Sequence, residues 1–130
     1  MKTLIIWILV LLGLLTQSVA ADNDVTSFTS IVKSVSKGTV AVAVDAPIKH
    51  SAPRVLGTGF IVANGFFAIT NYHVVSEDLD PTIVESYVVL SGEGTVVKKI
   101  KAEVLKIDPK HDLALLKLDS PLPALKLGDD

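Results

Sequence analysis

Two side chains in this sequence have the types that proton-transfer chemistry needs. His73 ends an apolar stretch, and Asp112 stands 39 residues later at the start of another. A histidine held at the end of a rigid strand can act as a general base near neutral pH. An aspartate that opens an apolar strand is costly to bury unless a partner compensates its charge. The pair therefore predicts a base and its orienting acid, which are two of the three members of a Ser-His-Asp triad, in the order His then Asp.

The element that must position His73 is a predicted β-hairpin. Apolar runs at residues 60–63 and 66–70 flank Asn64-Gly65. An Asn-Gly pair between apolar runs is typical of a type I′ turn, which requires positive φ at both central residues. The second run leads into Thr70-Asn-Tyr-His73, so the hairpin is expected to present the histidine at a strand end.

Further strand patterns fill the rest of the chain. We expect strands beginning at residues 39, 57, 66, 82, 95 and 113, and a turn at residues 91–94. In the strand at 95–108 the apolar-polar alternation slips by one residue beyond Val104, which predicts a β-bulge. Short strands at close spacing, separated by turn signals, predict an all-β barrel.

The first 20 residues resemble an export signal. Lys2 precedes an apolar run at 4–15, and Ser18-Val-Ala20 is a small-x-small cleavage site. Because a spanning helix needs about 20 apolar residues, we expect cleavage after Ala20 rather than a stable membrane span, although an uncleaved anchor is an alternative. The expected location is periplasmic or secreted. Residues 21–38 are expected to be a lead that contains a short amphipathic helix.

Composition excludes some classes of function. Lys2 lies in the predicted signal, and the rest of the chain has 14 acidic and 11 basic residues without a basic run, so nucleic-acid binding is not expected. The chain has no cysteine, which suits an exported bacterial protein that does not depend on disulfides. No cofactor is expected.

Several motifs in order resemble a known family. Gly57-Thr-Gly-Phe60, Thr70-Asn-Tyr-His-Val-Val75, Asp112-Leu-Ala-Leu-Leu-Lys117 and the closing Pro123–Asp129 are similar to the trypsin-like serine proteases, and most of all to their bacterial HtrA/Deg branch. The resemblance covers residues 26–130. It implies the chymotrypsin fold, with residues 39–130 forming the N-terminal antiparallel six-stranded Greek-key barrel and the second barrel absent from this sequence.

The resemblance also implies an activity and its residues. His73 would be the general base of a serine endopeptidase, and Asp112 would orient it; the expected partners are protein or peptide substrates, unfolded chains among them, and further copies in a homo-oligomer. The sequence lacks a Gly-x-Ser-Gly-Gly segment, so the family's nucleophile has no counterpart here. This chain alone is therefore expected to be inactive.

Two other functions stay open at the level of sequence. The missing nucleophile also fits a non-catalytic exported binding module with a single barrel. A metal hydrolase could use His73, His111 and Asp112, but neighbouring strand residues point to opposite faces, which makes it difficult for His111 and Asp112 to share one ion.

Overall fold

The computed structural model describes residues 22–93 and 95–128. The chain divides into two compact units, Met1–Lys33 and Ser34–Asp130. The predicted signal at 1–20 lies outside the described residues. Among the residues that are described, no helix is long and apolar enough to cross a membrane.

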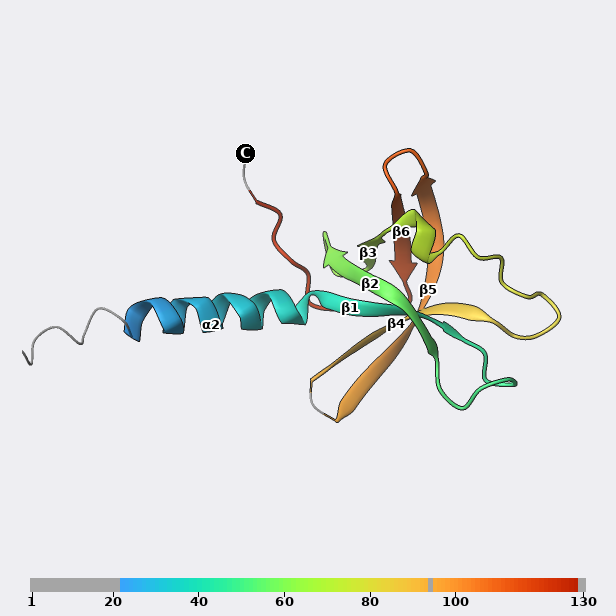
Figure 1. Cartoon of the computed structure of the whole chain (residues 1–130), viewed down its shortest axis with the longest axis horizontal. Coiled ribbons are helices and arrows are strands. Elements are labelled where there is room, and N and C mark those ends of the chain that lie inside the picture. The colour runs from blue at the N-terminus through green and yellow to red at the C-terminus, as the bar shows by residue number, and fades with distance from the viewer. Residues whose placement is uncertain (1–21, 94, 129–130) are drawn as a thin grey trace, which may run out of the picture. The chain divides into compact units, whose positions relative to one another are not determined.

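In the part of the chain that the structure describes, the regular structure consists of one α-helix and six strands, with a short 3₁₀ turn (Figure 1). Helix α2 spans Asp22–Lys37 and ends at Gly38, whose N–H donates to the Val35 carbonyl. The strands are β1 (Thr39–Asp45), β2 (Arg54–Val62), β3 (Phe67–Thr70), β4 (Ser86–Glu93), β5 (Val96–Asp108) and β6 (Leu113–Leu118), with the 3₁₀ turn η1 (Tyr72–Val74) after β3.

The six strands close into an antiparallel barrel in the order β1-β2-β3-β6-β5-β4. The pairing of β3 with β6 and of β1 with β4 joins strands that are not consecutive, which is a Greek-key arrangement. The expected all-β six-stranded barrel is confirmed.

Alternating apolar residues fill the barrel. Ile61, Ala68 and Leu116 are paired across β2, β3 and β6, and none of the three has solvent exposure. Val42 of β1 and Val89 of β4 are paired and equally buried on the opposite side of the barrel. This continuous core fixes the register of the strands that carry the candidate site.

The predicted hairpin is present, but its predicted turn type is wrong. Val62 pairs with Phe67, so the loop has four residues, and positive φ occurs at Ala63 and Gly65 rather than at both Asn64 and Gly65. The Asn64 side chain accepts a hydrogen bond from the Phe66 N–H, and that local bond competes with the expected two-residue turn.

Two further expectations, both around β4, are corrected. The strand begins at Ser86 instead of residue 82, because the Asp80 side chain accepts hydrogen bonds from the Thr82 N–H and hydroxyl and holds this segment in a turn. At its other end the strand continues through the predicted turn at 91–94 as far as Glu93. Gly92 allows this, since a Cβ there would lie 2.3 Å from the Val96 carbonyl oxygen of β5.

The predicted bulge is confirmed. The β5–β6 register shifts between Val104 and Lys106, which leaves Leu105 as the extra residue. The irregularity lies within the stretch of β5 that pairs with β6, beyond Lys101, which is the last residue paired with β4. A bulge of this kind bends the strand, and the end of β5 leads directly into the turn before β6.

Candidate active site

His73 lies in η1, directly after β3. The turn is fixed by its neighbours: Val74 and Val75 are buried, and their N–H groups donate to the carbonyls of Asn71 and Tyr72. The His73 side chain itself is 70% exposed. The backbone is therefore held by the core while the imidazole stands at the surface.

Asp112 occupies the residue before β6. Its φ of 53° is in the left-handed region, which is uncommon for a residue with a side chain. Its N–H donates to the Pro109 carbonyl at 3.3 Å, and its own carbonyl accepts a hydrogen bond of 3.0 Å from the Asn71 side-chain amide. Hydrogen bonds at both the N–H and the carbonyl of Asp112 thus hold its backbone in this conformation.

The structure brings the two predicted site residues together. The His73 N–H donates to Asp112 Oδ1 at 2.9 Å, and His73 Nδ1 lies 2.6 Å from Asp112 Oδ2. The contact follows from the topology, because β3 and β6 are neighbours and Thr70 pairs with Ala114. A carboxylate at Nδ1 favours the tautomer with hydrogen on Nδ1, which leaves Nε2 as the nitrogen that can accept a proton.

The hydrogen bonds also set the charge of the acid. The backbone N–H of His73, and next the His73 ring, hold the pKa of Asp112 below its usual range. Asp112 is therefore ionised at neutral pH, as an acceptor that orients the imidazole has to be.

Contacts of three residues near the pair were not predicted from the sequence. The Asn71 side-chain amide donates a hydrogen bond to the carbonyl of Asp112. His111 pairs with Asp108 instead: His111 Nδ1 lies 2.8 Å from Asp108 Oδ2, and the His111 N–H donates to Asp108 Oδ1 at 3.2 Å. The sequence signal was their spacing, since Asn71 stands two residues before His73 and Asp108 three residues before His111.

The surroundings of the pair bear on the two alternatives. No group of three or more His, Cys, Asp or Glu side chains within 22–93 and 95–128 is arranged to hold a metal ion. Ser76, the serine nearest to His73 in sequence, donates its hydroxyl to the His73 carbonyl at 3.2 Å and not to the ring. Its side chain is therefore engaged with the backbone of the turn.

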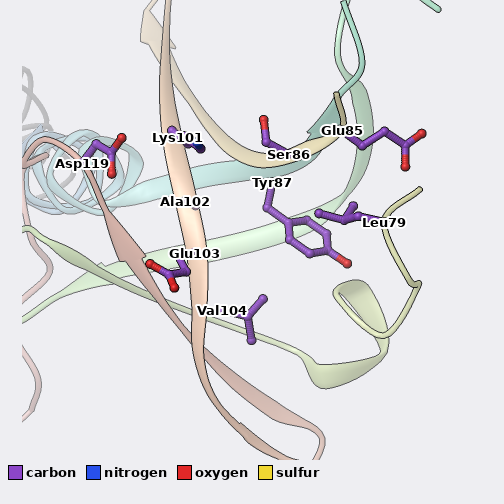
Figure 2. A pocket seen from close by; sticks show the side chains of 9 residues that line it. All are labelled: Leu79, Glu85, Ser86, Tyr87, Lys101, Ala102, Glu103, Val104 and Asp119. Atoms are coloured by element: carbon purple, nitrogen blue, oxygen red, sulfur yellow. The ribbon is translucent and has the colours of Figure 1, made fainter. Parts of the chain in front are cut away.

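Two of the cavities within the described residues lie against the second half of β5, away from the pair itself. The larger, about 500 Å³, opens between the start of β4 and the middle of β5, where Figure 2 shows the Tyr87 ring beside Leu79, with Val104 below it. The smaller, about 340 Å³, lies over the outer face of β3, β5 and β6, and Ile69, Ile107 and Leu113 are among its lining residues. Neither His73 nor Asp112 lines these two cavities.

Comparison with known proteins identifies the family. The sequence profile of the trypsin-like peptidase domain matches residues 57–130, which include both His73 and Asp112. The chain belongs to the trypsin-like peptidase domain family. The resemblance inferred from the sequence motifs is thereby confirmed.

Relatives and solved structures agree with this placement. The chain is 33% identical over 84 residues to a probable periplasmic serine endoprotease DegP-like of Brucella suis, and 41% identical over 75 residues to one of Pseudomonas putida. These matches cover 62% and 57% of this chain but only 15% and 14% of the relatives, so the chain spans a small part of their length. The crystal structure of Deg5 has the same fold, with a TM-score of 0.60 at 21% identity over 81% of this chain and 49% of that one.

Proposed function

We propose that this chain supplies the general base and the orienting acid of an exported serine endopeptidase that cleaves protein or peptide substrates. The observation that carries the proposal is the 2.6 Å contact between His73 Nδ1 and Asp112 Oδ2, with the imidazole exposed at the surface. His73 Nε2 would take the proton of an attacking serine and return it to the leaving amine, while Asp112 stabilises the imidazolium.

The nucleophile would be a serine outside these 130 residues. The family's Gly-x-Ser-Gly-Gly segment does not occur in the sequence, and the serine nearest to His73 is bonded to backbone. By resemblance, the second barrel would carry that serine and the oxyanion-hole amides. The names of the relatives and the predicted signal at 1–20 support a periplasmic or secreted location.

A non-catalytic binding module is the second candidate. The observation that favours it is the same missing nucleophile segment. The two candidates differ in what the barrel does when a second barrel is supplied: a proteolytic half becomes active, and a binding module does not.

The test joins this chain to the second barrel of the Pseudomonas putida relative. The chimera should hydrolyse unfolded casein and react with a serine-directed fluorophosphonate, and the unjoined chain should do neither. Labelling of the unjoined chain that His73→Ala abolishes would place the nucleophile within these residues. A folded chimera without labelling would favour the binding module.

Within the chimera, His73→Ala and Asp112→Ala should each lower kcat by about 10⁴-fold, and the double variant should lose little more, because the residues act as one unit. His50→Ala is the matched control, since His50 lies in the exposed loop between β1 and β2. Losses that multiply in the double variant would contradict the pairing.

A further inference from the structure

A second histidine-aspartate pair lies beside the first and repeats its geometry. Asp108 accepts from the His111 N–H through Oδ1 and contacts His111 Nδ1 through Oδ2, at 3.2 and 2.8 Å. Asp112 makes the same two contacts with His73, at 2.9 and 2.6 Å. The second pair differs in being local, since its members are three residues apart and belong to one turn.

That turn is the connection that carries Asp112. Asp108 is the last residue of β5 and pairs with Leu113, the first residue of β6, so the loop consists of residues 109–112. The Asp108–His111 bonds close this loop from inside, next to the Asp112 N–H bond to Pro109. Asp112 follows His111 directly, and its left-handed φ of 53° sets the direction in which its carboxylate leaves the backbone.

The Asp108–His111 pair contributes little to the packing of the barrel. The side chains of His111 and Asp108 are 62% and 49% exposed, and neither residue belongs to the buried core. A charge-assisted hydrogen bond that closes a turn restricts the backbone it encloses, even where it buries no apolar surface. The residue most affected here is Asp112, which has a left-handed φ at the end of the turn.

We propose that Asp108 and His111 are positioning residues for the dyad: by closing the 109–112 turn they keep Asp112 in its left-handed conformation, with its carboxylate aimed at His73. The catalytic meaning of this inference rests on the proposed function. The geometry that it predicts is measurable without any activity.

The experiment follows the proton between His73 Nδ1 and Asp112 by NMR in the 130-residue chain at fixed pH. A proton in so short a hydrogen bond gives a resonance far downfield, which His73→Gln should remove. In His111→Ala the exchange of this proton with solvent should become about tenfold faster, because local opening of the turn is no longer opposed by a charge-assisted bond. His50→Ala, at an exposed histidine outside this turn, should leave the exchange unchanged.

Two further variants separate positioning from general stability. His111→Asn places an amide donor where Nδ1 stood and should restore most of the protection, whereas Asp108→Ala should lose it as His111→Ala does. Thermal unfolding of each variant should differ little from that of the parent. The inference is overturned if His111→Ala and Asp108→Ala leave the exchange rate unchanged, or if His111→Asn behaves like His111→Ala.

The same variants in the chimera distinguish the two proposals. His111→Ala should lower kcat with little change in KM, since the turn orients the base and does not bind substrate. A chimera without activity whose dyad proton still responds to His111→Ala would refute the proposed function and leave the positioning role standing. An active chimera whose kcat is insensitive to His111→Ala and Asp108→Ala would refute the positioning role alone.

Discussion

The Asp112 carboxylate accepts from two groups of His73, and this has a consequence for its titration. Because those bonds hold the pKa of Asp112 down, the folded chain should release the Asp112 proton below about pH 3.9, the ordinary midpoint of an aspartate. The carboxyl carbon shift in an acid titration measures this directly. His73→Ala should raise the midpoint only part of the way, because the backbone N–H, which is the larger cause, remains.

The sign of the linked stability follows from the same shift. A carboxyl with a depressed pKa in the folded state contributes stability above its unfolded value, so the contribution is present above about pH 4 and is lost as the pH falls through the lower folded midpoint. An Asp112 midpoint at or above the ordinary value would contradict the observed hydrogen bonding.

Gly65 is the position at which a side chain should be tolerated least. Its φ is 90°, and a Cβ there would lie 2.4 Å from the Leu122 carbonyl oxygen. Gly65→Ala should therefore lower the free energy of unfolding by about 1–3 kcal/mol, through backbone strain and displacement of the segment around Leu122. Gly128→Ala is the matched control, since a Cβ there meets nothing within 4 Å. Equal urea midpoints for the two variants would count against this account.

At the scale of elements, the β2-β3-β6 row is the part of the core that supports the site. Leu116 is fully buried, next to Ala68 across the ladder that brings β3 beside β6. Leu116→Ala should cost about 3–5 kcal/mol in a denaturant titration, as expected when a buried leucine leaves a cavity. Leu127→Ala removes the same atoms from a residue that is 76% exposed, and it should cost less than about 0.5 kcal/mol.

The elements also show what a sequence can and cannot predict here. Alternation of apolar residues located most strands and even the bulge after Val104, because burial inside a barrel imposes a period of two. The predicted strand start was wrong at residues 82–85, where the Asp80 side chain outcompetes strand pairing. The turn type predicted from Asn64-Gly65 was wrong because the Asn64 side chain reshapes the turn. Such local side-chain bonds leave no periodic trace in the sequence.

The candidate site also has features that could be predicted from the sequence and features that could not. That His73 and Asp112 should meet was predictable from residue types and chain order, although their catalytic role stays a prediction. The left-handed backbone of Asp112 and the Asp108–His111 pair were not predictable, because they depend on how one short turn closes. The sequence analysis considered His111 as a possible metal ligand, and the structure instead pairs it with Asp108.

For the whole molecule, the outer apolar strip predicts association. Phe60, Ile69 and Leu115 are paired in one row across the outer face of β2, β3 and β6, and Ile107 and Leu113 extend it, both about half exposed. Contiguous apolar surface of this kind promotes association when nothing covers it. We expect residues 21–130 to sediment as oligomers at micromolar concentration and to bind a hydrophobic dye.

A charge on the strip provides the test. Phe60→Lys should shift the sedimentation profile toward monomer, whereas Ile48→Lys, at an even more exposed apolar residue in the loop after β1, should not. A parent chain that sediments as a sharp monomer without dye binding would rule out the association. In the chimera the second barrel should suppress association if it covers this face.

The β3–β6 ladder has a consequence for the order of events in folding. The two strands are separated in the chain by all of β4 and β5, so their pairing closes a long loop. Because closing a long loop costs conformational entropy, this pairing is expected to form late in folding. His73 and Asp112 sit on either side of that ladder and cannot meet before it forms. The downfield proton between them would therefore report the pairing of β3 with β6. In a refolding experiment this resonance should appear with the slowest phase, after the amides of the β4–β5 hairpin have become protected from exchange.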